Sequence, residues 1–334
     1  MKSNWLFILF AVIITIVVTQ GLIQSYHDNL FKEKEYAEYL ASQPIDSSWI
    51  APSLFVDRET KGKEREMVIY GQDLIAHTSK YFGQKGSINK LTNGMNCQNC
   101  HLDAGTRPWG NNYGAVYSKY PQYRSRSNTI QDIYGRINDC FERSLNGKAI
   151  DTNSYEMKSI YSYMKWLGKE VPKGIKPYGA GLPSIPLMDR EANVTKGKII
   201  YLSICQTCHG DKGQGVLTLT GNEYIYPPLW GEHSYNDGAG LYRLSSFAAY
   251  VENNMPYNLA THAQPKLSIE EAWDVAAFVN SQFRPHIDQS KDWPDKSKKA
   301  FDVAFGPYID NFSSRQHKYG PYEQIIKANK IKIK

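Results

Sequence analysis

Two short motifs, NCQNCH and ICQTCH, constrain this chain more than any other feature. They contain Cys97, Cys100 and His101 and, 108 residues later, Cys205, Cys208 and His209. C-x-x-C-H is the attachment signature of c-type haem, because two thiols bond the vinyl groups on one edge of the macrocycle and the adjacent histidine reaches the iron. The two pairs lie too far apart for a zinc finger, and a disulfide framework would leave both histidines unexplained. The motifs therefore predict two covalently bound haem c groups.

The segments around the two motifs repeat as well. A helical pattern precedes each motif, in REMVIYGQDLIAHTSKYFG and in KGKIIYLSIC, where Gly197, Tyr201 and Cys205 are spaced by four. Another follows after a long loop, in SYEMKSIYSYMKWLG and in SIEEAWDVAAFVNSQF, where Ser268 is a candidate N-cap. Each half therefore predicts a helix, a haem motif, a long loop and a closing helix. This is the plan of a small cytochrome c, so we expect an all-α fold with two cytochrome c-like domains in tandem and extended loops.

The domain limits follow from composition. We expect domains at 50–170 and 187–290, joined by a linker at 171–186 that is rich in proline and glycine. Residues 1–25 hold an apolar run from Trp5 to Val18 behind Lys2. This run is shorter than the roughly 20 residues of a full membrane span, so it predicts either a signal peptide or an uncleaved membrane anchor. Both alternatives place the rest of the chain in the periplasm, soluble after cleavage or tethered to the inner membrane.

The charge of the chain is concentrated at its C-terminus. The formal net charge is +6, and residues 291–334 hold ten Lys/Arg against five Asp/Glu. The remaining body is close to neutral, which argues against a nucleic-acid-binding face. We expect 291–334 to be a solvated basic extension, with docking of an acidic redox partner as the alternative.

Each haem iron needs a sixth ligand, and the second half offers few candidates. Met255 is the only methionine after His209 and stands just before the closing helix, where a small cytochrome c brings its distal ligand. His262 and His233 are the alternatives. On the proximal side, a backbone carbonyl in the YPPLWG loop, from Pro227 or Pro228, is a candidate to orient the His209 ring.

In the first half the distal candidate is the fifth cysteine. No histidine lies between His101 and His209, and Met157 and Met164 stand seven apart on the closing helix, where core packing is the favoured role. Met188 lies beyond that helix, in the second half. Cys140 follows His101 by 39 residues, as Met255 follows His209 by 46, and both precede a closing helix. Cys140 is therefore placed in the distal slot of the first haem, with an inert buried thiol as the alternative.

Arginines surround this cysteine. The whole chain has 28 Lys and 11 Arg, yet the segment 102–146 has one Lys and five Arg, namely Arg107, Arg124, Arg126, Arg136 and Arg143. Arginine suits fixed, multi-donor binding of oxyanions. We expect some of these side chains to pair with haem propionates or acidic neighbours. The remainder would form an anion site beside Cys140, which favours an enzyme with a small oxyanion substrate over a pure electron carrier.

These blocks together resemble the di-haem c-type thiosulfate dehydrogenases, some of which act as tetrathionate reductases. The resemblance covers nearly the whole chain after the leader and rests on CQNCHLDAGT, RINDCFERSLNG, CQTCHG, YPPLWGEHSYNDGAG and FGPYIDNFSSRQHKYGP. It implies that His101 and Cys140 ligate a catalytic first haem and that His209 and Met255 ligate the second. By position it also implies that Arg126, Arg136 and Ser144 line the substrate pocket. The implied reaction converts two thiosulfate ions into tetrathionate and two electrons, or the reverse.

Two other functions stay open on the sequence. One is a di-haem electron-transfer cytochrome c without its own substrate, and the other is a sulfur-oxidation cytochrome that conjugates thiosulfate to a carrier protein. The expected redox partner is a small c-type cytochrome or a membrane quinone-linked protein. The sequence does not determine the preferred direction, the oligomeric state, the cleavage of the leader, which arginines bind substrate, or whether Cys140 also carries sulfur covalently.

Overall fold

The computed structural model describes residues 49–54, 57 and 59–330, together with 15, 18–21 and 24. Most of the predicted signal or anchor segment, 1–25, lies outside the described residues. Within the described part, no helix is both long and apolar enough to cross a membrane. Ser48–Lys334 forms one compact unit, and the elements below belong to it.

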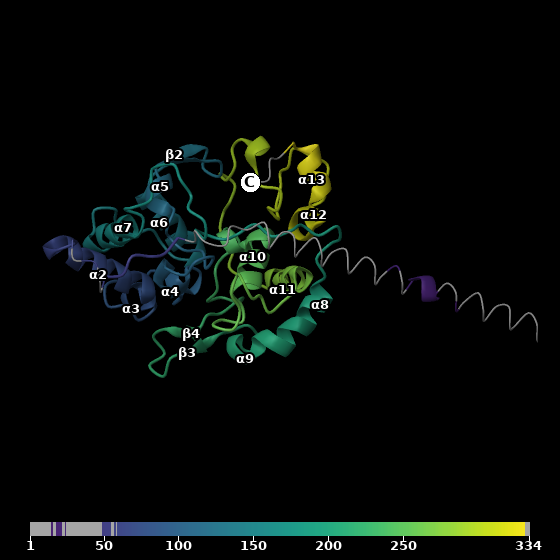
Figure 1. Ribbon diagram of the computed structural model, residues 1–334, viewed down its shortest axis with the longest axis horizontal. Helices are drawn as coiled ribbons and strands as arrows, with labels where there is room; N and C mark the ends of the chain where they lie inside the picture. Colours follow the sequence, from purple (N-terminus) through teal and green to yellow (C-terminus); the bar gives the residue numbers. More distant parts are fainter. Residues whose placement is uncertain are drawn as a thin grey trace, which may run out of the picture. The chain divides into compact units, whose positions relative to one another are not determined.

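The first half is built on two crossed helices. Helix α2 (Gly62–Ala76) packs against the closing helix α7 (Tyr155–Leu167) (Figure 1). Gly71 allows the close crossing, because a Cβ there would overlap the carbonyl oxygen of Ser159. The smaller elements between them are α3 (Thr78–Phe82), a 3₁₀ turn (Cys97–Asn99), α4 (Leu102–Gly105), α5 (Val116–Lys119), β1 (Gln122–Arg124), β2 (Thr129–Gln131), α6 (Ile133–Asp139) and a π-helical turn (Cys140–Ser144).

The second half repeats this crossing. Helix α8 (Val194–Ile200) packs against the closing helix α11 (Ile269–Ser281), which also contacts α10 (Leu244–Asn254). A Cβ at Gly197 would overlap the carbonyl oxygen of Asp274, so a glycine again sets the helix contact. The remaining elements are a π-helical turn (Tyr201–Cys205), α9 (Gln206–His209), β3 (Val216–Leu217), β4 (Tyr224–Tyr226) and a 3₁₀ turn (Gly240–Tyr242).

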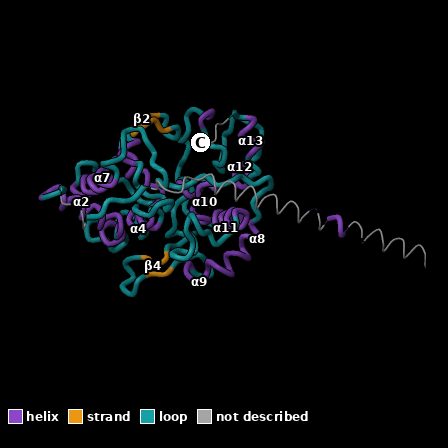
Figure 2. The backbone as a smooth tube through the Cα atoms, viewed as in Figure 1, coloured by secondary structure: helices purple, strands orange, loops and turns teal. Residues whose placement is uncertain are grey.

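The all-α prediction with tandem cytochrome c domains is confirmed. Extended loops separate the helices (Figure 2), and the strands of the described residues form two short antiparallel hairpins, β1–β2 and β3–β4. Helix α11 begins after Ser268, whose side chain forms a capping box with Glu271. Gly197 and Tyr201 are both buried, but a π-helical turn that the pattern did not predict starts at Tyr201, so KGKIIYLSIC is not one regular α-helix.

The expected solvated C-terminal extension is also wrong. The segment forms a 3₁₀ turn (Lys296–Lys298), α12 (Ser314–Tyr319) and α13 (Glu323–Ala328). Tyr322 and Ile325 are 2% and 0% exposed and join the hydrophobic core of the second half. The tail therefore packs against the body of the protein through its apolar side chains, while Lys298 and Lys327 stay exposed and Lys299 is buried.

Candidate active site

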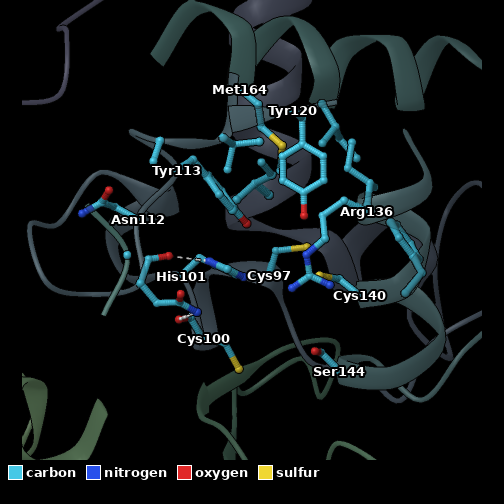
Figure 3. Close-up of a pocket in the computed structure, with 18 of the residues that line it drawn as sticks. Cys97, Cys100, His101, Asn112, Tyr113, Tyr120, Arg136, Cys140, Ser144 and Met164 are labelled. Carbon is cyan, nitrogen blue, oxygen red and sulfur yellow. Dashed lines mark hydrogen bonds between the residues drawn. The ribbon is translucent and has the colours of Figure 1, made fainter. Parts of the chain in front are cut away.

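The first haem motif opens onto a cavity of about 350 Å³. Its lining includes both attachment cysteines, His101 and Cys140, and Figure 3 shows these side chains reaching inward from separate segments of the chain. Much of the rest of the wall is apolar, with Ile75, Met95, Val116, Ile137, Phe141, Leu145, Ile160 and Met164. An apolar pocket with a few convergent polar groups beside two thiols fits a covalently attached macrocycle.

His101 is oriented for metal binding. Its Nδ1 donates to the carbonyl oxygen of Asn111 at 2.5 Å, and its ring stacks on Tyr113 with the centroids 4.5 Å apart. The bond at Nδ1 leaves Nε2 available to an iron in the cavity. Burial lowers the pKa of His101 to about 4, so the imidazole is neutral, which is the form that binds metals.

The second motif repeats this arrangement. His209 Nδ1 donates to a carbonyl oxygen at 2.9 Å, and the acceptor is Pro227 rather than Pro228. Burial lowers the pKa of His209 as well. Met255 directly follows α10 and packs, partly buried, against the same hydrophobic core as Cys205. The residues of the second motif therefore fit a second haem in the same way.

The two alternative ligands in the second half, His262 and His233, make contacts with other side chains. The ring of His262 lies 4.3 Å from that of Trp109, and its Nδ1 lies 2.5 Å from the side-chain oxygen of Asn253. His233 Nδ1 lies 3.1 Å from the side-chain amide nitrogen of Gln84. An Nδ1 contact leaves Nε2 available, as at His101, so these contacts do not decide the ligand. Met255 stays the predicted distal ligand because it directly follows α10.

Cys140 and Ser144 are presented by the π-helical turn that follows α6. Helix α6 begins at Asp132, whose carboxylate accepts from the backbone nitrogen of Gly135. The change to π-helical geometry occurs at Cys140, and such turns recur at functional sites. Cys140 and Ser144 both line the cavity, and Figure 3 shows Ser144 on the same side as Cys140.

The three methionines considered beside Cys140, namely Met157, Met164 and Met188, lie in different parts of the structure. Met157 is fully buried in the core of that half, whereas Met188 belongs to the core of the second half. Met164 is 7% exposed and lines the cavity with Cys140. Its place on α7 fits the packing role expected for it, as part of the apolar wall.

Arg136 stands one helical turn before Cys140 and lines the same cavity (Figure 3). The negative charge of the Cys140 thiolate is the largest cause that raises the pKa of Arg136, and Asp139, with its carboxylate 3.8 Å away, adds to the effect. The guanidinium therefore stays charged, and it complements negative charge at Cys140.

Arg126 is not among the residues that line this cavity. Its guanidinium donates to the carbonyl oxygen of Gly238 at 2.6 Å, lies 3.9 Å from the carboxylate of Asp292 and covers the ring of Trp293 at 4.8 Å. The reason is its place in the β1–β2 hairpin loop, which faces the second half of the chain. The structure therefore brings Arg136, Cys140 and Ser144 together and places Arg126 apart from them.

Two other arginines satisfy acidic neighbours, as expected. Arg143 makes two hydrogen bonds of 2.9 Å to Asp292. Arg107 Nε lies 2.7 Å from the carboxylate of Asp103. Neither lines the cavity.

Arg124 is one of the five arginines considered for the anion site, whereas sequence reasoning missed the two lysines of the cavity wall. Lys119 from α5, Arg124 from β1 and Lys176 from the predicted linker line it together with Arg136. Burial and the charge of Lys119 lower the pKa of Lys176. Four cations thus surround the space, and among the described residues no carboxylate lines it. Such a site favours anions, whether haem propionates, a substrate or both.

Two family models match the chain. The model of the SoxA/TsdA cytochrome c domain matches residues 87–172, which contain His101, Cys140 and Arg136. The model of the cytochrome c family matches residues 194–283, which contain His209 and Met255. The two matches support two haem c groups, one for each motif, and the geometry at His101 and His209 fits both.

Several proteins named thiosulfate dehydrogenase are similar in sequence to this chain. The chain is 40% identical over 208 residues to the thiosulfate dehydrogenase of Psychrobacter arcticus, which covers 62% of each chain. It is 35% identical to that of Stutzerimonas stutzeri, over 66% of this chain and 68% of the relative, and 39% identical to that of Allochromatium vinosum, over 58% and 71%.

A solved structure shares the fold. The thiosulfate dehydrogenase (TsdBA) of Marichromatium purpuratum, in its as-isolated form, superposes with a TM-score of 0.65 at 32% identity. The match covers 73% of this chain and 52% of that one. With two covalently bound haem c groups in two cytochrome c domains, and with relatives of this similarity, the chain belongs to the thiosulfate dehydrogenase family.

Proposed function

We propose that the protein interconverts thiosulfate and tetrathionate, by the balanced reaction 2 S₂O₃²⁻ ⇌ S₄O₆²⁻ + 2 e⁻. The observation that carries this proposal is a cavity lined by Cys140 and four cations, with no carboxylate among the described residues that line it. The names of the relatives support the same substrate. The alignment spans 62% of the Psychrobacter arcticus protein, so the proposal rests on the residues of this chain.

The first task of the site is to bring two dianions together. Two unit charges 4 Å apart repel by about 4 kcal/mol at an effective dielectric constant of 20, and each pair of dianions contains several such terms. Arg136 offsets this repulsion next to Cys140, and Lys119, Arg124 and Lys176 extend the positive field across the cavity. The Ser144 hydroxyl, on the same turn as Cys140, is placed to donate a hydrogen bond to a substrate oxygen. Fixed donors of this kind stabilise charge without reorganising during the reaction.

The second task is to move two electrons. Haem iron supplies one-electron redox chemistry at each site. We assign His101 and Cys140 as the ligands in the first half, and His209 and Met255 in the second. A thiolate donates charge to iron and lowers its potential, whereas a methionine raises it. The ligands alone therefore favour electron flow from the first half to the second when thiosulfate is oxidised.

The electrons must then leave the protein. We propose a periplasmic location and, as redox partner, a small c-type cytochrome or a membrane quinone-linked protein. The apolar run behind Lys2 supports export, and the covalent haem motifs suit an exported cytochrome. Whether a leader tethers the protein to the membrane follows from the mass of the mature chain, which mass spectrometry measures directly.

A steady-state assay in both directions tests the proposed reaction. Purified holoprotein is supplied with thiosulfate and ferricyanide, or with tetrathionate and a reduced viologen. We expect turnover in at least one direction, with free tetrathionate or free thiosulfate as the product. Failure in both directions would identify an electron-transfer cytochrome without its own substrate. A product found only when a carrier protein is added, and bound to that protein, would identify the conjugating cytochrome.

A further inference from the structure

The turn that presents Cys140 is held from outside by residues of the second half. Asn236 lies in the loop before α10 and is 1% exposed. Its side-chain nitrogen donates to the carbonyl oxygen of Glu142 at 2.8 Å, and its backbone nitrogen donates to that of Arg143 at 3.1 Å. Both carbonyls belong to the turn Cys140–Ser144. The last carbonyls of a helix lack partners within it, so Asn236 caps this turn across a separation of about 90 residues in sequence.

The side chain of Asn236 is fully used in this position. Its second amide hydrogen goes to the side-chain oxygen of Asn146 at 3.0 Å, and its own oxygen accepts from the backbone nitrogen of Gly238 at 3.1 Å. A buried side chain with all its polar atoms satisfied has one strongly preferred geometry. The cap is therefore rigid, and it fixes both the end of the turn and the residues that follow it.

The C-terminal tail provides a second contact to the same turn. Arg143 donates from both terminal nitrogens to Asp292, at 2.9 Å each, and the two side chains are 15% and 10% exposed. Bidentate pairing of this kind fixes orientation as well as distance. Asp292 also lies 3.9 Å from Arg126, so one tail carboxylate holds two arginines of the first half.

Two neighbouring residues, Gly238 and Trp293, support the contact between the tail and the turn. A Cβ at Gly238 would meet the Arg143 guanidinium, so a glycine allows the approach. Trp293, 4% exposed, donates from its backbone nitrogen to the carbonyl oxygen of Arg126 at 2.7 Å. The tail is thus joined to the first half by side-chain contacts of Asp292 and by a main-chain contact of the next residue, Trp293.

We propose that Asn236 and Asp292 form a clamp that fixes the turn Cys140–Ser144, so that the second half and the tail determine where Cys140 lies over the first haem. They are positioning residues, because they act through the turn and line no part of the cavity. The inference rests on the proposed role of Cys140 as the distal ligand of that haem. In this proposal the tail helps to position Cys140 in the first half, although its buried apolar side chains pack in the core of the second half.

Two variants remove the clamp with little change of shape. Asp292→Asn keeps the volume but removes the charge that pairs with Arg143. Asn236→Asp replaces the donating amide with an oxygen that faces two acceptors. Asp288→Asn is the matched control, because Asp288 lies just before the tail, is exposed, and its carboxylate accepts hydrogen bonds from Ser290.

Near-infrared magnetic circular dichroism of the ferric holoprotein provides the main readout, since it distinguishes thiolate–histidine from methionine–histidine ligation. In both clamp variants we expect part of the thiolate signal to disappear while the methionine signal of the second haem stays. Iodoacetamide labelling gives an independent readout, because the other four cysteines are thioethers and Cys140 is the free thiol. Labelling of Cys140, counted by peptide mass spectrometry, is expected to rise in both variants and not in Asp288→Asn.

Kinetics separate positioning from substrate binding. We expect kcat to fall roughly tenfold in the clamp variants, with KM changed less than twofold, as for other residues that orient metal ligands. Asp292→Glu keeps the negative charge, so we expect it to retain more of the thiolate signal than Asp292→Asn. Unchanged thiolate signal and labelling in both clamp variants would overturn the clamp. A wild-type spectrum without thiolate would overturn the ligand assignment, and with it the basis of the clamp, whatever the assay of thiosulfate turnover gives.

Discussion

At the scale of single residues, the environment of Cys140 separates it from an inert buried thiol. It lines the cavity opposite a histidine whose Nε2 is left available, and Arg136 stands one turn away on the same face. The pKa of Arg136 is raised chiefly by the Cys140 charge. The charged guanidinium of Arg136 therefore complements negative charge at Cys140.

Replacement of the thiolate tests its role in turnover. In Cys140→Met we expect a higher potential for the first haem, because a thioether donates less charge than a thiolate. We expect kcat for thiosulfate oxidation to fall by more than about tenfold, or about 1.4 kcal/mol of transition-state stabilisation. Redox titration followed by absorbance, with the assay above, measures both, and the second haem is the internal control. A variant that keeps most of its activity would show that the thiolate is dispensable.

Neutralising Arg136 tests the anion site. In Arg136→Gln we expect kcat/KM to fall by about 10²–10³, as when a fixed donor to a charged transition state is removed. Arg315→Gln is the matched control, because Arg315 lies in the tail with 71% of its side chain exposed, and its kcat/KM should stay within twofold of the wild type. Equal effects in the two variants would indicate general electrostatics rather than a local site.

The sequence predicts only some of the residues that line the cavity. Arg136, Cys140 and Ser144 are spaced by four in the sequence, but the π-helical turn that starts at Cys140 changes the spacing of their side chains. Their shared place in the cavity is therefore a finding of the structure. Lys119, Arg124 and Lys176 come to the same cavity from three separate segments. Tertiary packing alone places them, and no local pattern predicts it. Arg126 shows the converse, because the family resemblance implied a place in the pocket while its hairpin directs it to Gly238 and Asp292.

At the scale of elements, each half depends on a glycine where two helices cross. In Gly197→Ala we expect a loss of about 1–3 kcal/mol in the free energy of unfolding, because the added methyl group overlaps the backbone of Asp274. Gly240→Ala is the control, since nothing lies within 4 Å of a Cβ there, and a change within about 0.5 kcal/mol is expected. Denaturant unfolding followed by circular dichroism measures both. Equal midpoints for the two variants would contradict the tight crossing.

A buried link between the N-terminal segment and α7 predicts a pH effect. The hydrogen bond from Trp166 Nε1, at 2.5 Å, is the largest cause that lowers the pKa of Asp57 below the ordinary value of an aspartate, with the hydrogen bond from Thr60 next. A carboxylate with a lowered folded-state pKa stabilises the fold above its unfolded pKa, and this contribution is lost as the pH falls through the folded value. The wild type should therefore exceed Asp57→Asn in melting temperature at pH 6, and the gap should narrow at pH 2.5.

Glu59→Gln provides the control for this pH effect, because the Glu59 side chain is 90% exposed. Its melting temperature should follow that of the wild type at both pH values. A gap between the wild type and Asp57→Asn that stays constant or widens on acidification would contradict the assigned role of Asp57.

Elements were predictable to different degrees for physical reasons. The capping serine before α11 and the buried stripe of α7 are local signals, and both are found in the structure. The π-helical turns Cys140–Ser144 and Tyr201–Cys205 interrupt the helical period by one residue. A hydrophobic pattern averages over such an interruption, so the sequence predicts the helix and misses the turn.

At the scale of the whole molecule, the C-terminal segment joins the two halves. Its lysines dominated the sequence interpretation, because net charge counts every residue equally. Burial depends instead on a few apolar side chains, among them Trp293, Val303 and Ile325, each less than 5% exposed. Through Asp292 the same segment contacts the turn that carries Cys140, and through the Trp293 backbone it contacts Arg126 in the β1–β2 hairpin loop. A segment expected in solvent therefore contributes to the second core and contacts the first site.

Removing one tail side chain tests this integration. Ile325 is 0% exposed within the second core, and Ile325→Ala should lower the free energy of unfolding by about 2–5 kcal/mol, the usual cost of truncating a buried isoleucine. Lys327→Ala, with a side chain 73% exposed, is the control and should stay close to the wild type. Denaturant unfolding is followed by the charge-transfer band of the methionine-ligated ferric haem, which reports on the second half. If the Ile325→Ala midpoint matches that of Lys327→Ala, the tail does not stabilise the second core, and its contact with the first site would have to be sustained by Asp292 and Trp293 alone.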